Sequence, residues 1–205
     1  MPFSPYLSSS PLADHIMPLL QSWLDRQRQK NLDKRKIYSQ ELSWTIQLPA
    51  RFTLRKRATA QKNYDKTAKM MGDPASGSIY KDGKTHPVFS CHYDKFNSLS
   101  GAIVKADGFS PEEIQLSRED CKDRLAHMFS RISNTSLERS STNIRVGGME
   151  FEQHTFLIRR NGRPIICFEY LCQTIGEYEL SFSITYNNET HRQAMFKCLE
   201  ESKFV

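Results

Sequence analysis

The sequence lacks long apolar runs and a recognisable targeting segment. No stretch of its 205 residues approaches the roughly 18 consecutive apolar residues of a membrane-spanning helix. Residues 1–20 have no basic n-region, and Asp14, His15 and several prolines interrupt any apolar signal-peptide core. We therefore expect no membrane span, and a cytoplasmic location if the numbering is full length. If a leader has been removed, we expect a periplasmic or exported protein.

Cysteine usage gives no sign of a disulfide framework. The five cysteines are an odd number, and no two of them form a C-x-x-C pair. Cys121 and Cys198 fall on the apolar stripes of predicted helices, which indicates small core residues. This usage agrees with a reducing compartment.

The common catalytic and nucleotide-binding patterns are missing as well. The sequence contains no G-x-x-x-x-G-K-[ST], no G-x-G-x-x-G after a strand, no G-x-S-x-G and no H-E-x-x-H. Cys91, His154 and Asp94 could be combined into a nucleophile, a base and an orienting group, but any chain with this many Cys and His residues allows such a set. We therefore expect no catalytic residues, no cofactor and no enzymatic activity.

One region leaves an alternative open. In a regular strand His86 and His92 share a face, whereas Cys91 points to the opposite one. A structural zinc site needs about four ligands in closely spaced pairs, so we predict no metal here. The alternative is an enzyme or a metal-dependent protein that uses the Cys91/His92 region.

Positive charge is concentrated in one part of the chain. The net charge is +6, but residues 26–62 hold eleven Lys and Arg against two acidic residues, so this segment is +9 and the remainder −3. It contains a candidate partner-binding segment, formed by Arg51, Phe52, Arg55, Lys56 and Arg57. Such a segment suits phosphates or an acidic protein. An ordinary solvated loop explains the same residues, and we favour that interpretation.

The expected partner is another protein of unknown identity. Nucleic-acid binding normally comes with an aromatic platform or a recognition helix, and the sequence indicates neither. We therefore predict that nucleic acid is not the partner.

Residues 12–30 predict an amphipathic helix ahead of the main domain. Its apolar stripe consists of Leu12, Ile16, Leu19, Leu20, Trp23 and Leu24. This stripe is too apolar to stand alone in water, so it packs on its own domain, on a second copy of the chain or on a foreign partner. We expect the first arrangement, with an exchanged homodimer as the alternative. The expected division is a tail and helix over residues 1–37 and one domain over residues 38–205.

The first half of this domain predicts short strands and two helices. Alternating apolar residues over 38–48 indicate its first strand, and shorter strands follow at 88–92 and 100–106. A short helix is expected over residues 59–71. A longer helix is expected over residues 117–132, with Ser117 at its start and Cys121, Leu125, Met128, Phe129 and Ile132 on its inner stripe.

The last third predicts consecutive antiparallel strands closed by a helix. Strands are expected at 137–146, 149–159, 164–173 and 178–186, with an Asn161-Gly162 hairpin turn and a Gly147-Gly148 turn. In the last strand the face with Glu179, Ser181, Ser183 and Thr185 is expected to be wet. A helix over residues 188–203 can be capped by Asn187 or Asn188. We expect Trp44, Phe182, Leu125 and Leu199 to share one core.

Several of these segments resemble the PsbP-like fold family, which includes the photosystem II extrinsic protein PsbP, a Ran-binding nuclear import factor and bacterial DcrB-like proteins. The resemblance covers residues 38–204. Its carrying segments are Trp44-Thr-Ile-Gln-Leu-Pro49, Ile144-Arg-Val-Gly-Gly-Met-Glu-Phe151, Tyr178–Tyr186 and the closing helix that ends Glu201-Ser-Lys-Phe204. It implies an α+β fold: an α/β/α sandwich around a largely antiparallel sheet. The N-terminal helix departs from the family's compact pattern, and we expect it as an extension of this fold.

The resemblance also implies a function. Proteins of this family generally act as non-enzymatic binding modules, and no catalytic residues carry over from them. Some cytosolic DcrB-like members serve as chaperones for secreted effectors. We therefore expect a protein-binding or adaptor module.

Overall fold

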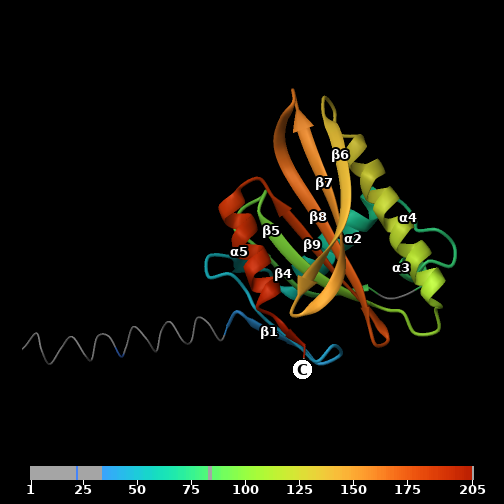
Figure 1. Ribbon diagram of the computed structural model, residues 1–205, viewed down its shortest axis with the longest axis vertical. Helices are drawn as coiled ribbons and strands as arrows, with labels where there is room; N and C mark the ends of the chain where they lie inside the picture. The colour runs from blue at the N-terminus through green and yellow to red at the C-terminus, as the bar shows by residue number, and fades with distance from the viewer. Residues whose placement is uncertain (1–21, 23–33, 83–84, 205) are drawn as a thin grey trace, which may run out of the picture. The chain divides into compact units, whose positions relative to one another are not determined.

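The computed structural model describes residues 22, 34–82 and 85–204, which form an α+β fold with antiparallel sheets (Figure 1). The chain divides into two units, residues 1–36 and 37–205. The first unit lies almost entirely outside the described residues, so the helix expected over residues 12–30 stays a prediction. Within the described part, none of the helices combines the length and apolar character of a membrane span.

The main sheet contains seven strands that pair antiparallel. From one edge to the other these are β3 (Thr53–Leu54), β4 (Thr85–His92), β5 (Ser98–Lys105), β9 (Tyr178–Tyr186), β8 (Arg163–Ile175), β7 (Met149–Arg160) and β6 (Ser136–Val146). The order places β5 beside β9, so the two halves of the chain meet in the middle of the sheet.

A second, three-stranded sheet corrects the first predicted strand. Residues 38–48 are not one strand, because the chain turns after β1 (Lys36–Ser39) and enters β2 (Trp44–Gln47). Ser43 has φ 46° and its N–H donates to the Gln40 carbonyl at 3.2 Å, which closes this turn. β2 then pairs with β10 (Lys203–Phe204), not with the main sheet.

Four helices belong to the described part: α2 (Arg57–Met71), α3 (Ile79–Asp82), α4 (Pro111–Ser130) and α5 (Glu189–Glu200). In Figure 1, α5 lies on one side of the main sheet and α4 on the other, with α3 beside α4. Of the two predicted caps of α5, Asn187 and Asn188, the structure uses Asn188, whose side chain accepts from the backbone N–H groups of Thr190 and His191.

The start of α4 was predicted seven residues too late. Ser110 is the N-cap: its hydroxyl accepts from the Glu113 N–H at 3.2 Å, and the Glu113 carboxylate accepts from the Ser110 N–H at 2.7 Å. Pro111 at the first helical position completes this capping box. Ser117 is instead buried, donates to the Glu113 carbonyl and accepts from the Ile79 N–H.

The four residues of the predicted single core lie in two separate clusters, one on each face of the main sheet. Trp44, Phe182 and Leu199 share the cluster beneath α5, as predicted. Leu125 belongs to a separate cluster beneath α4, together with Cys121 and the sheet residues Phe156, Tyr170 and Cys172. Because successive residues of a strand point to opposite faces, Leu171 lies in the first cluster and its neighbours in the second.

The face of β9 that was expected to be wet is largely covered. Glu179 is fully buried, and Ser181, Ser183 and Thr185 are half-buried. These side chains therefore lie on a covered, polar face of the sheet.

Candidate functional site

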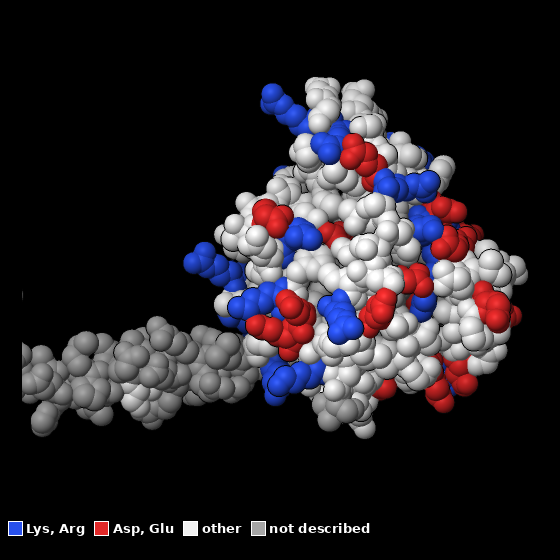
Figure 2. Space-filling model, in the orientation of Figure 1, with Lys and Arg blue, Asp and Glu red and all other residues white. Residues whose placement is uncertain are grey.

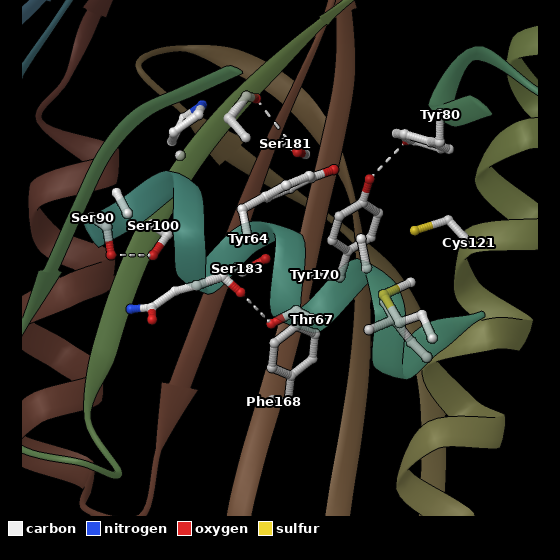
Figure 3. Close-up of a pocket in the computed structure, with 18 of the residues that line it drawn as sticks. Tyr64, Thr67, Tyr80, Ser90, Ser100, Cys121, Phe168, Tyr170, Ser181 and Ser183 are labelled. Carbon is white, nitrogen blue, oxygen red and sulfur yellow. Dashed lines mark hydrogen bonds between the residues drawn. The ribbon is translucent and has the colours of Figure 1, made fainter. Parts of the chain in front are cut away.

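A cavity of about 410 Å³ lies between α2 and the polar face of β4, β5, β9 and β8. Small-molecule sites typically have volumes of about 300–1,000 Å³, so this cavity can hold a compact organic molecule. Figure 3 shows Tyr64 and Thr67 of α2 together with serines of β4, β5 and β9 around it.

The floor of the cavity is a row of hydroxyl groups set by strand register. Ser90 pairs with Ser100, Ser100 with Ser183, and Ser183 with Tyr170, so four hydroxyl side chains follow one another across four strands. The Ser100 hydroxyl donates to that of Ser90 at 2.9 Å (Figure 3). Each hydroxyl can both donate and accept a hydrogen bond, so the row can bind several polar atoms of one ligand.

A second cross-strand row adds an apolar edge. Ser98 pairs with Thr185 and Thr185 with Phe168, and all three line the cavity. Tyr170 closes the same side, and its hydroxyl lies 2.8 Å from that of Tyr80 (Figure 3). The cavity therefore combines a hydrogen-bonding floor with an aromatic wall.

The tyrosines and the cysteine around the cavity are held in their neutral forms. Burial raises the pKa of Tyr64, and it raises the pKa values of Tyr80 and Tyr170 well above their ordinary range. Burial also raises the pKa of the Cys121 thiol to about 11. No histidine is among the described residues that line the cavity, so its hydroxyls have no imidazole base there.

The helix that covers the cavity is held by few buried side chains. Of the fifteen residues of α2 only Ala60 is buried, while Gln61, Tyr64 and Met71 are half-buried. Its N-cap, Lys56, provides no side-chain hydrogen bond, and its first turn carries no acidic residue. A helix with so little burial opens at a low free-energy cost compared with the strands beneath it.

The predicted partner-binding segment leads into this helix, with Lys56 as its N-cap and Arg57 as its first residue. Arg51, Lys56 and Arg57 are exposed, whereas Arg55 is half-buried, lines the cavity and donates its backbone N–H to the Ser90 carbonyl at 2.8 Å. Phe52 is only 5% exposed and belongs to the core cluster beneath α5. Phe52 therefore offers little surface to a partner, and the exposed part of the segment is its basic residues.

Charge is mixed rather than grouped by sign on one face of the molecule. On the face shown in Figure 2, Lys and Arg side chains alternate with Asp and Glu. This interspersed pattern gives that face no continuous area of one sign.

The Cys91/His92 region forms no joint site. Cys91 is fully buried in the core beneath α5, and burial raises the pKa of its thiol to about 12. His92 follows it on the strand and points to the other face. His154 lies on β7 across the sheet, and Asp94 is bound into the β4–β5 loop through Phe96 and Asn97. The structure thus does not bring these residues together.

Comparison with known proteins finds a similar fold but no similar sequence. The sequence matches no protein-family model and no curated protein sequence. The solution structure of cyanobacterial PsbP (CyanoP) from Synechocystis sp. PCC 6803 is similar to this chain, with a TM-score of 0.51 and 7% sequence identity. The match covers 83% of this chain and 91% of that chain. The protein therefore has a PsbP-like fold, which confirms the resemblance seen in the sequence.

Proposed function

We propose that this protein is a non-enzymatic binding module whose main site is the cavity beneath α2. The observation that carries the proposal is the row of four hydroxyl side chains, Ser90, Ser100, Ser183 and Tyr170, beneath one loosely held helix. The ligand is a small, neutral organic molecule with several hydroxyl or amide groups and one flat face. Its polar groups bind the floor, and its flat face packs on Phe168 and Tyr170.

Two observations support binding without catalysis. The cavity contains hydroxyl groups, but nucleophilic catalysis by a hydroxyl needs an adjacent base. The thiol of Cys121 is the other candidate nucleophile, and its raised pKa keeps it protonated at neutral pH. All five cysteines are free and buried, which also supports our proposal that the protein works in a reducing compartment such as the cytoplasm.

A screen of small molecules tests the cavity. Neutral polyols, amides and hydroxylated aromatic compounds would be screened for binding by ligand-observed NMR. We expect hits whose binding is lost in Ser183→Phe, which fills the cavity, and kept in Ser136→Phe on the exposed start of β6. Circular dichroism would check that both variants fold. An absence of hits, or hits that bind Ser183→Phe as well as the wild type, would overturn the proposal.

A second candidate function is protein binding through the basic segment. Arg51, Lys56 and Arg57 are exposed, and Arg55 also lines the cavity, so a partner at this segment could sense whether the cavity is occupied. Some cytosolic DcrB-like members of the PsbP-like fold family, which the sequence resembles, serve as chaperones, and this supports an adaptor role of this kind. The partner would carry an acidic surface, because the segment is basic.

Salt dependence tests this second function. A partner isolated by pull-down should bind less tightly as ionic strength rises past about 0.15 M, where the Debye length falls below about 8 Å. Charge reversal at Arg51, Arg55 and Arg57 should weaken binding further. Affinity that is insensitive to both changes would remove the basic segment from the interface.

A further inference from the structure

Three side chains with metal-binding atoms meet beneath α4, outside the cavity described above. Glu152 and His154 are two residues apart on β7 and so share one face of the sheet, and Cys172 of β8 pairs directly with Glu152. A carboxylate oxygen, an imidazole nitrogen and the thiol sulfur all lie within 4.8 Å of one another. The strand register therefore brings together one oxygen, one nitrogen and one sulfur ligand.

One ring nitrogen in this cluster is buried without a hydrogen-bond partner. His154 is 5% exposed, and its Nε2 atom forms no hydrogen bond within the described structure. Its other nitrogen, Nδ1, lies 2.9 Å from the Ser141 hydroxyl. When Nδ1 donates its proton to Ser141, Nε2 carries a free lone pair that faces the Glu152 carboxylate, 3.6 Å away. A buried and unpaired lone pair of this kind is what a metal ion would satisfy.

The carboxylate is oriented in the same way. Glu152 Oε1 accepts a hydrogen bond from Arg118 at 2.8 Å, and Oε2 is the atom on the side of His154. Metal ligands in proteins are commonly held by such outer hydrogen bonds, one to the histidine and one to the carboxylate. Two of the three proposed ligands, His154 and Glu152, are therefore already oriented by outer hydrogen bonds of the kind found around metal ions.

The charges of this partly buried group favour a dication. Glu152 and Glu179 are both bound to Arg118, so this group carries a net charge of −1 with the imidazole neutral. A dication together with a Cys172 thiolate brings the same group to zero. Burial of an unbalanced charge is costly, so the ion would neutralise the cluster rather than add charge to it.

We propose that Glu152, His154 and Cys172 bind one zinc ion. Zinc accepts nitrogen, sulfur and oxygen ligands in tetrahedral geometry, and a mixed set of three protein ligands leaves the fourth position for water. A hollow of about 390 Å³ lined by His154, Ser141 and Lys122 lies beside the cluster. The site is separate from the cavity beneath α2 and does not depend on the proposed function.

Metal analysis of the full chain tests the site. The protein, purified without chelators or a metal-binding tag, would be titrated with Zn²⁺ and, in parallel, with Co²⁺. We expect one ion per chain and, with Co²⁺, the strong absorption that arises from charge transfer between a thiolate and the metal. Less than a tenth of an equivalent of bound zinc, or a Co²⁺ spectrum without this absorption, would overturn the proposal.

Matched variants locate the ion. Cys172→Ala should abolish the charge-transfer absorption of the Co²⁺ form. Cys167→Ala should keep it, because Cys167 lies on the same strand but its side chain points to the opposite face of the sheet. His154→Ala should lose zinc, whereas His127→Ala at the exposed end of α4 should not. Zinc binding that all four variants share equally would place the ion elsewhere and overturn the proposal.

A conservative variant covers the case in which a buried substitution prevents folding. Glu152→Gln keeps the volume and one oxygen of the side chain but removes its charge. We expect its affinity for Zn²⁺ to fall at least about tenfold, the lower end of what outer-shell changes already cost. Unchanged affinity in this variant would exclude Glu152 as a ligand and overturn the three-ligand site.

Discussion

Arg118 of α4 binds both carboxylate oxygens of Glu179 in β9, from Nε at 2.8 Å and from Nη2 at 2.9 Å. Both residues are buried, and Thr174 accepts from the same guanidinium while it donates to the carboxylate. The pair joins a helix and a strand 61 residues apart in the sequence. It therefore fixes the position of α4 over the sheet.

Removal of Arg118 should destabilise the protein strongly. Arg118→Ala leaves Glu179 buried without its partner, which typically costs about 3–5 kcal/mol of unfolding free energy. Urea denaturation measures this value. Arg139→Ala, which removes an exposed pair with Asp123, is the control and should change stability little. A loss below about 1 kcal/mol in Arg118→Ala would show that water replaces the bond, since exposed pairs contribute no more than that.

The two cores predict additive effects. Leu125→Ala and Leu199→Ala should each cost about 2–5 kcal/mol, because both side chains are fully buried. Since they lie in separate clusters on opposite faces, the double variant should show the sum of the two losses within about 0.5 kcal/mol. Leu116→Ala on the exposed side of α4 is the control. A large coupling energy would mean that the two clusters form one cooperative core.

The hairpin turn predicts a sharp difference between two substitutions. Asn161 has φ 51° and Gly162 has φ 74°, as the sequence indicated. Gly162→Val should therefore cost about 1 kcal/mol or more, because a β-branched residue strongly disfavours positive φ. Asn161→Gly should be close to neutral, since glycine adopts this conformation readily. Equal melting temperatures for wild type and Gly162→Val would contradict the turn.

The buried thiols predict low reactivity in the native state. Burial raises the pKa of each of the five cysteines, to about 11 for Cys121 and about 12 for Cys91. The reactive thiolate is therefore scarcer at pH 8 than for an exposed thiol, whose pKa is about 8.5. With EDTA present, we expect slow reaction of all five with a disulfide reagent in the native protein and fast reaction of all five in denaturant. Rapid native modification of any one thiol would contradict its burial.

The sequence by itself determined the elements whose signals are local. The Asn161-Gly162 turn, the Asn188 cap and the strand over Tyr178–Tyr186 each depend on a few neighbouring residues, and all three are confirmed. The α4 start was wrong because two serines, Ser110 and Ser117, both precede acidic residues at suitable spacing. Ser110 makes the better cap, because Glu113 completes a capping box with it and Pro111 occupies the first helical position.

Only the tertiary structure decided which face each residue occupies and which distant residues meet. Trp44–Gln47 pairs with Lys203–Phe204, more than 150 residues away, and no local pattern encodes this choice. The covered polar face of β9 was expected to be wet because alternation shows that two faces differ, but not what packs on each.

The two candidate sites depend on register in the same way. Ser90, Ser100 and Ser183 become one row, and Glu152 and Cys172 become neighbours, only through the pairing of β4, β5, β9, β8 and β7. Along the chain these residues have no diagnostic spacing. A cross-strand neighbour is fixed by backbone hydrogen bonds between strands, and this is why the sequence determined the strands while the folded sheet determined the sites.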